Sequence, residues 1–144
     1  AKKRVVGILA EMGFGEDRVN QPMEDLSRGM QQKVAVARAL FTSPFLLLMD
    51  EPTTGLDPVS KRQVQDYVLR IQERHEATIL FTSHDMDEAE RVCNRIAIIH
   101  HGKFIAVGTV DELRHQAGCP EGSLEDVFFE MTGKDLAHAD LEGE

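Results

Sequence analysis

The sequence predicts an α/β domain with a parallel sheet flanked by helices. Short apolar runs bounded by turn residues, which are typical of strands, alternate with longer segments whose apolar residues recur at helical spacing. The strands are expected at residues 45–49, 78–82 and 96–99. This alternation favours parallel strands, and such sheets carry their chemistry at the carboxyl ends of the strands.

Composition narrows the class of protein. The 144 residues suit one domain, and 42% hydrophobic residues are enough for a core. A net charge of −9 argues against nucleic-acid binding. No apolar run approaches ~18 residues, and the apolar stretch after the basic start at 1–4 is too short for a signal peptide. Cys93 and Cys119 lack a CxxC spacing, which favours free thiols on the cytoplasmic side over a disulfide.

The first part of the chain is expected to be helical. A short helix is predicted from Lys3 to Met12, with Gly13 as its stop, followed by a polar loop over 15–25. Ser27 then offers its hydroxyl as the N-cap of a second helix that ends at Pro44. The apolar positions of this helix are Met30, Val34, Ala37 and Phe41.

The middle of the chain contains two strands, each followed by a helix. The continuous apolar run 45–49 predicts a strand buried on both faces. Asp57 and Pro58 are the cap and first residue of a helix. Its apolar face consists of Val64, Tyr67, Val68 and Ile71. After the strand at 78–82, Asp85 and Glu88 predict a capping box that opens a short helix to about Cys93.

The last part of the chain begins with the strand at 96–99. A turn at 101–103 leads into an extended segment at 104–107. Thr109 with Glu112 is another capping-box pattern. Ser123 is expected to cap a final helix with one apolar face, made of Leu124, Val127, Phe128 and Met131.

Polar residues follow the first two strands, where chemistry is expected. Asp50 and Glu51 end the first strand, and His84 comes two residues after the second. A carboxylate suits Mg²⁺, a second carboxylate can orient water toward a phosphoryl group, and the histidine can hydrogen-bond a phosphate. The alternative is a polar strand end with Glu51 in solvent and a histidine satisfied at an ordinary turn.

A third candidate lies at the start of the second helix. Ser27, Gly29 and the helix start present free backbone N–H groups toward an anion. An ordinary N-cap gives the same local pattern, so this segment is weak evidence by itself.

Taken together, these segments resemble the ATPase domain of ABC transporters. Residues 26–40 resemble the signature motif and its helix, and 45–52 resemble the Walker B strand with its catalytic glutamate. Residues 54–58 are similar to the D-loop and 82–90 to the switch-histidine segment. The resemblance extends from about residue 3 to residue 133, and it implies a partial P-loop NTPase fold.

The resemblance implies a role for each residue at the strand ends. Asp50 would hold Mg²⁺, Glu51 would be the general base or position water, and His84 would contact the γ-phosphate of ATP. The implied activity is ATP hydrolysis that powers transport across a membrane.

The resemblance also implies partners. Ser27 and Gly29 would contact the ATP of a second ATPase domain, with Arg28 and Met30 beside them. We call residues 27–30 the signature segment. Arg28 and Met30 stand where the family usually has a glycine and a glutamine, which puts the fine ATP geometry in question.

A second segment is expected at the seam between two ATPase domains. It consists of Gly55, Leu56 and Asp57, which we call the D-loop segment. The second domain would be a copy or a homologue. A transmembrane permease would hold the pair on the inner face of the membrane, at its cytoplasmic side.

The sequence lacks the phosphate-cradling motif GxxxxGK followed by Ser or Thr. Neither Gly102-Lys103 nor Gly133-Lys134 has the required neighbours. We therefore expect a truncated domain that has no appreciable ATPase activity alone. Its parts would be a signature region at 1–43, a Walker B to switch-histidine region at 44–93, strands and helices at 94–133, and a polar tail at 134–144.

The missing P-loop strand has a structural consequence. In the family that strand lies between those expected here at 78–82 and 96–99. We expect these two strands to pair directly, or the chain to fold poorly with unpaired edges.

Other readings remain open. Residues 123–133 are similar to the end of the export-type branch. A soluble ABC ATPase acting on ribosomes, a chromosome-type ATPase and a non-catalytic interaction module are the alternatives. Adjacent His100 and His101 are expected to be a polar pair near a turn, since neighbours on a strand point to opposite faces and make a poor metal site.

Overall fold

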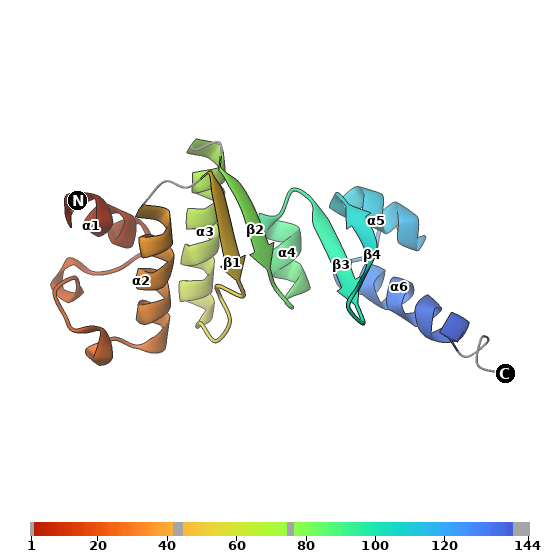
Figure 1. The fold of residues 1–144 in the computed structure, drawn as a ribbon, viewed down its shortest axis with the longest axis horizontal. Coiled ribbons are helices and arrows are strands. Elements are labelled where there is room, and N and C mark those ends of the chain that lie inside the picture. Colours follow the sequence, from red (N-terminus) through yellow and green to blue (C-terminus); the bar gives the residue numbers. More distant parts are fainter. Residues whose placement is uncertain (1, 42–44, 75–76, 140–144) are drawn as a thin grey trace. The chain divides into compact units, whose positions relative to one another are not determined.

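The computed structural model describes residues 2–41, 45–74 and 77–139. The chain is α/β, and it divides into two compact units, residues 1–84 and 85–144. Figure 1 shows helices α1 to α3 with strands β1 and β2 in unit 1, and helices α4 to α6 with strands β3 and β4 in unit 2.

Unit 1 opens with two helices joined by a polar segment. Both predicted helices are present, and helix α1 (Lys2–Glu11) packs against α2 (Arg28–Phe41). Between them lie two short 3-10 helices, Glu16–Arg18 and Met23–Asp25, where the sequence predicted a loop. Ser27 caps α2 as predicted, because its Oγ accepts a hydrogen bond from the Met30 amide at 3.3 Å.

The buried stripe of α2 differs in part from the prediction. Ala37 is fully buried as expected, but Met30, Val34 and Phe41 are only half-buried. The buried positions are Lys33, Val36, Ala37 and Leu40. The apolar residues cover more than one side of this helix, so their spacing alone did not decide which side packs inward.

The strands of unit 1 form a parallel pair. Strand β1 (Leu46–Asp50) pairs with β2 (Thr78–Thr82), and Asp50 lies opposite Thr82. Helix α3 (Pro58–Arg74) connects them, as a parallel connection requires. The predicted apolar face of α3 is buried at all four positions, with Val64 at 0% exposure.

The prediction that the first strand is buried on both faces is wrong. Leu47 and Met49 are buried, whereas Leu46 and Leu48 on the other face are exposed. Leu80 of β2 is also exposed. A continuous apolar run predicts two covered faces, but the described part of this chain covers only one.

Unit 2 is built around an antiparallel hairpin. Strand β3 (Ile96–His100) pairs with β4 (Lys103–Gly108) through a turn in which His101 has φ 46° and Gly102 has φ 74°. Positive φ at both central residues matches the right-handed twist of a hairpin. The predicted turn is confirmed, and β3 belongs to this hairpin rather than to the parallel sheet.

The predicted direct pairing of the strands at 78–82 and 96–99 is wrong. Over the described residues the structure has two separate two-stranded sheets, β1–β2 and β3–β4. The local hairpin satisfies one edge of β3 through a short turn, and such a local pairing costs less chain entropy than a distant one.

Three helices cover the hairpin of unit 2. They are α4 (Met86–Val92), α5 (Val110–Ala117) and α6 (Leu124–Ala139). Helix α6 continues past Gly133 into the polar tail. The core is one cluster of buried residues: Ile96, Ile98, Ala106, Leu113, Ala117, Leu124 and Val127.

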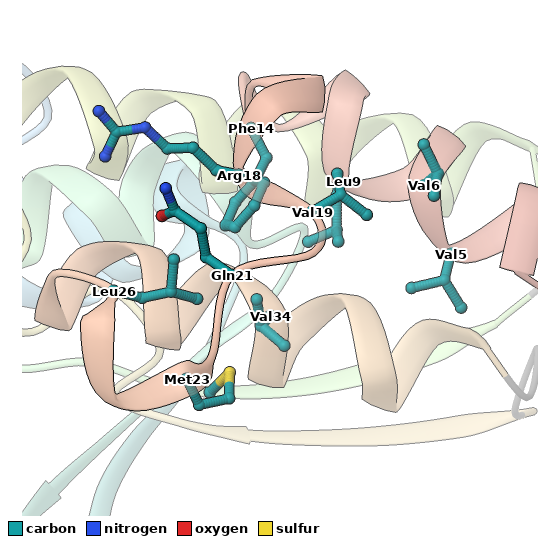
Figure 2. Close-up of a pocket in the computed structure, with 10 residues that line it drawn as sticks. All are labelled: Val5, Val6, Leu9, Phe14, Arg18, Val19, Gln21, Met23, Leu26 and Val34. Atoms are coloured by element: carbon teal, nitrogen blue, oxygen red, sulfur yellow. The ribbon is translucent and has the colours of Figure 1, made fainter.

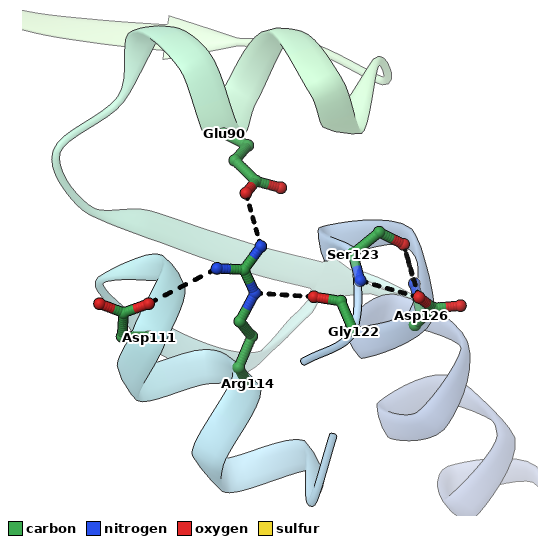
Figure 3. Close-up of polar contacts among 6 residues, drawn as sticks. All are labelled: Glu90, Asp111, Arg114, Gly122, Ser123 and Asp126. Carbon is green, nitrogen blue, oxygen red and sulfur yellow. Dashed lines mark hydrogen bonds and ion pairs between the residues drawn. The ribbon is translucent and has the colours of Figure 1, made fainter. Parts of the chain in front are cut away.

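Helix caps and one arginine join the helices of unit 2. Asp85 caps α4, Thr109 and Glu112 form the predicted capping box of α5, and Ser123 caps α6. Figure 3 shows Arg114 donating to Glu90 of α4 and to the Gly122 carbonyl, both at 2.7 Å. This guanidinium therefore links α4, α5 and the segment before α6.

No helix in the described ranges combines the length and the apolar character needed to cross a bilayer.

Candidate functional site

The carboxyl ends of β1 and β2 bring together the predicted catalytic residues. Asp50 ends β1, and its Oδ1 accepts a hydrogen bond of 2.5 Å from the Thr82 hydroxyl at the end of β2. Glu51 follows Asp50, and its Oε1 lies 3.2 Å from Nδ1 of His84. Parallel pairing in register thus places two carboxylates and an imidazole at one edge of the sheet.

Glu51 has an unusual backbone conformation. Its φ is 43°, in the left-handed region that side chains with a Cβ rarely adopt. Its amide donates to both the carbonyl and the hydroxyl of Thr82, at 3.1 and 3.0 Å. Such conformations cost about 1–3 kcal/mol and cluster at functional sites. The left-handed conformation sets the direction of the Glu51 side chain. The two hydrogen bonds of the Glu51 amide help to offset the free-energy cost of this conformation.

The Glu51 carboxylate is held from two sides. The Thr54 hydroxyl donates to its Oε2 at 2.8 Å, and His84 contacts its Oε1. These hydrogen bonds, with Thr54 the larger influence, lower the pKa of Glu51 below its ordinary value. Glu51 is thus ionised at neutral pH, as a residue that orients water must be.

Asp50 offers the chemistry of a magnesium ligand. Mg²⁺ prefers oxygen ligands, and proteins commonly bind it through one or two carboxylates together with substrate phosphates. Asp50 is exposed at the strand end, and Thr82 supplies a hydroxyl oxygen beside it. The described residues contain no group of three or more His, Cys, Asp or Glu placed to hold a metal.

The signature and D-loop segments lie against each other. A methyl group placed on Gly29 would sit 3.5 Å from Leu56 and 4.0 Å from Oδ2 of Asp57, which are ordinary contact distances. Gly55 has φ 76°, and Arg28 lies above it with its guanidinium 3.8 Å from where a Cβ would be. A glycine at 55 therefore suits the backbone conformation, while the arginine lies at an ordinary contact distance.

Three further contacts position the side chains of these two segments. The Asp57 carboxylate accepts from the Val59 and Ser60 amides at 3.1 and 3.0 Å and caps α3 as predicted. Hydrogen bonding from Ser60 lowers the pKa of Asp57. Met30 contacts Arg18 through its sulfur at 3.4 Å, and the Ser27 side chain is exposed.

Buried polar contacts connect the helices behind the site. Lys33 of α2 is 5% exposed, and its Nζ donates to Oε1 of Gln63 on α3 at 2.5 Å. Burial lowers the pKa of Lys33, and the nearby Asp57 charge opposes that shift. Gln32 donates to the Pro52 carbonyl at 2.9 Å. Helix α2 is therefore attached both to α3 and to the turn that follows Glu51.

A pocket of about 360 Å³ lies in unit 1, away from the strand ends. Figure 2 shows side chains of α1, the 14–26 segment and α2 around it. Leu26 is the lining residue nearest in sequence to the signature segment, and the lining is mainly aliphatic. Arg18 is the one charged residue in this lining, and Asp50, Glu51 and His84 are not part of it.

Three residues that hold Asp50, Glu51 or the turn after them were not predicted from the sequence as parts of the site. Thr82 was placed at a strand end and in the switch-histidine resemblance, but its pairing opposite Asp50 is visible only in the strand register. Thr54 was placed in the D-loop resemblance, and its position three residues after Glu51 was the available signal. Gln32 carried no signal, because its contact with Pro52 joins segments far apart in the chain.

Comparison with known proteins relates the chain to ATP-binding subunits of transporters. The family model described as ABC transporter matches residues 1–54. The chain is 41% identical over 112 residues, 78% of its length, to the glycine betaine/proline betaine transport system ATP-binding protein ProV of Escherichia coli (strain K12). It superposes with a TM-score of 0.79 and 33% identity on a solved ATP-binding subunit of an ABC transporter, covering 91% of this chain.

The chain belongs to the ABC transporter ATPase family. Its fold is accordingly the P-loop NTPase fold in its ABC form. It is also similar to a dimeric post-hydrolysis structure of the ATP-binding cassette MJ0796 bound to ADP and Pi, with a TM-score of 0.68, 29% identity and 75% of this chain covered.

The chain spans only part of these ABC relatives. It covers 28% of ProV, 54% of the solved ATP-binding subunit and 46% of MJ0796. The activity, ligands and partners of the whole protein are therefore proposals.

Proposed function

We propose that this chain supplies the water-positioning and signature parts of an ATP-hydrolysing site in an ABC transporter. The observation that carries the proposal is the contact between Glu51 and His84 beside Asp50, at the carboxyl ends of two parallel strands. A general base, a phosphate contact and a cation ligand are the groups that phosphoryl transfer to water requires.

Each residue has a distinct part in the proposed chemistry. Glu51, ionised and held by Thr54, accepts a hydrogen bond from the attacking water and orients it. His84 contacts that carboxylate through Nδ1, and as the imidazolium it can also donate to the γ-phosphate through Nε2. Asp50 with Thr82 holds Mg²⁺, which neutralises phosphate charge when it is bound.

A second ATPase domain is the proposed partner. Ser27 is exposed, and it opens α2 beside Gly29. Free amides at a helix start favour an anion, which suits an ATP held by the partner domain. The similarity to a dimeric ATP-binding cassette supports this arrangement. The D-loop segment would lie at the same seam, since it packs on the signature segment.

A transmembrane permease is the other proposed partner. It would hold the paired ATPase domains on the cytoplasmic face of the membrane. The export-type branch stays a prediction, because the name of the relative ProV describes a transport system for glycine betaine and proline betaine without giving a direction.

The test is Mg²⁺-ATP binding and phosphate release by the purified chain, with Glu51→Gln beside it. We expect no appreciable turnover, because the sequence has no GxxxxGK[S/T] motif to cradle the phosphates. Adding a polypeptide that carries this motif and completes the domain should restore release, and Glu51→Gln should abolish the restored rate. Turnover by the chain alone that Glu51→Gln removes would contradict the account of the missing P-loop.

One observation favours a second candidate, a non-catalytic interaction module. The exposed face of β1 and β2 presents apolar side chains, among them Leu46 at 56%, Leu48 at 66% and Leu80 at 60% exposure. Parallel sheets are normally covered on both faces, so this face suits another polypeptide. A partner that binds there with equal affinity when Glu51 and His84 are replaced, and never yields phosphate release, would favour this second function.

A further inference from the structure

The strained turn at Glu51 depends on contacts from several directions. A left-handed φ at a residue with a Cβ persists only when the surrounding structure over-determines it. One contact comes from β2, through Thr82 to the Glu51 amide. A second is local, because the Thr54 amide donates to the Glu51 carbonyl at 3.2 Å and its hydroxyl to the carboxylate.

The third contact comes from the helix that carries the signature segment. Nε2 of Gln32, on the second turn of α2, donates to the carbonyl of Pro52 at 2.9 Å. Pro52 is itself buried and follows Glu51 directly. A proline has no N–H, so its carbonyl is its one backbone hydrogen-bonding group, and Gln32 satisfies it.

From these contacts we infer that Gln32 is a positioning residue for Glu51, acting through the Pro52 carbonyl. The inference rests on the proposed function, in which Glu51 orients the attacking water. It assigns to the signature helix a second role within its own chain, besides the contact with a partner's nucleotide. Gln32 itself touches no reacting group.

The same contact joins two sites. The signature segment at the start of α2 contacts Leu56 and Asp57. One turn later, Gln32 donates a hydrogen bond to the Pro52 carbonyl. A shift of the start of α2 would therefore act on residues 51–52 through Gln32 and on residues 55–57 through the signature segment. In a pair of ATPase domains, nucleotide bound against the signature segment would set how firmly Glu51 of that same chain is held.

The neighbouring Gln31 provides a matched control. It has the same side chain on the same helix, but its Nε2 donates to the carbonyls of Met23 and Leu26, at 2.8 and 3.1 Å. Gln31→Met thus removes two glutamine-to-carbonyl hydrogen bonds and Gln32→Met removes one, and the two side chains bind different segments. Both side chains are half-buried.

The experiment is residue-resolved amide hydrogen exchange on the full chain. For Gln32→Met we expect the Glu51 and Thr54 amides to exchange about fivefold faster, the factor that corresponds to one lost net hydrogen bond of about 1 kcal/mol. For Gln31→Met those amides should keep their rates, and the Leu26 amide, which donates to Met23, should become faster. The core amides of α3 around Val68 should not change in either variant.

A second readout follows the consequence for the catalytic pair. The carbon-bound ring protons of His84 should shift at constant pH in Gln32→Met toward their positions in Glu51→Gln, because the contact with Glu51 loosens. A stability loss alone would not move these signals in the folded protein. Gln31→Met should leave them in place.

Two results would overturn the inference. One is an equal change at every amide, including those of α3, which would mean that Gln32 affects global stability only. The other is unchanged exchange at Glu51 and Thr54. Neither readout uses nucleotide, so the failure of the chain to bind Mg²⁺-ATP with a completing partner would count against the proposed function and not against this inference.

Discussion

Both units of this chain contain buried apolar side chains, but their strands differ in what covers them. In unit 2 the hairpin, α5 and α6 enclose a cluster in which Leu113 and Val127 are fully buried. In unit 1 the strands expose leucines on one face, and the residues at their ends are held by hydrogen bonds such as those on Glu51. The hairpin of unit 2 is therefore covered by packed helices, while the strand ends of unit 1 carry exposed side chains that hydrogen bonds hold in place.

The difference predicts unequal responses to the loss of a leucine side chain. Leu113→Ala in unit 2 removes a side chain with 0% exposure, and it should lower the free energy of unfolding by about 2–5 kcal/mol. Leu80→Ala in unit 1, at 60% exposure, should cost less than about 1 kcal/mol. Urea unfolding of both variants measures the contrast. Equal losses would mean that the exposed face of β1 and β2 is covered in solution.

A second contrast concerns arginines. Arg114→Met should cost about 1–3 kcal/mol, because it leaves Glu90 and the Gly122 carbonyl without their donor. The matched variant Arg62→Met in unit 1 breaks only an exposed pair with Asp66 at 3.6 Å, and it should change stability by less than about 0.5 kcal/mol. The thermal unfolding midpoints report both. A larger effect for Arg62 would show that surface charge, not the link among helices, stabilises the chain.

The smallest expected difference between the units concerns how their stability responds to acid pH. Hydrogen bonds from Thr54 and His84 lower the pKa of Glu51, and hydrogen bonds from Ser123 lower that of Asp126. A lowered folded pKa contributes stability above the unfolded value of about 3.9–4.3, and that contribution is lost as the pH falls through the folded pKa. Midpoints measured from pH 5 to pH 3 should therefore fall.

Two variants separate the contributions of the units to this acid response. Glu51→Gln should flatten the decline in unit 1, and Asp126→Asn should flatten it in unit 2. Carboxyl titrations followed by NMR identify the group responsible. Titration of either carboxyl at its ordinary pKa would contradict the hydrogen bonds described.

Local signals in the sequence predicted many elements well. The caps at Ser27, Asp57 and Thr109 and the strand at 78–82 are all present. These features depend on residues within one turn or one run, so neighbours in sequence decide them. The family was recognisable for the same reason, because its motifs are short and ordered along the chain.

Features that depend on distant segments were predicted less well. The buried face of α2, the exposure of Leu48 and the partner of the strand at 96–99 were each expected otherwise. The spacing of apolar residues indicates that one face of a helix or strand is apolar. Which other element packs on that face depends on segments far away in the sequence. The roles assigned to Asp50, Glu51 and His84 stay predictions that the proposed experiments test.

The sequence by itself determined the family, the order of most elements and the residue types available for phosphate chemistry, since each of these follows from short-range pattern. Only the tertiary structure decided the left-handed turn at Glu51, the threonine opposite Asp50 and the grip of Gln32 on Pro52. Each of the last two joins segments about twenty or more residues apart, and local propensity carries no information about such contacts.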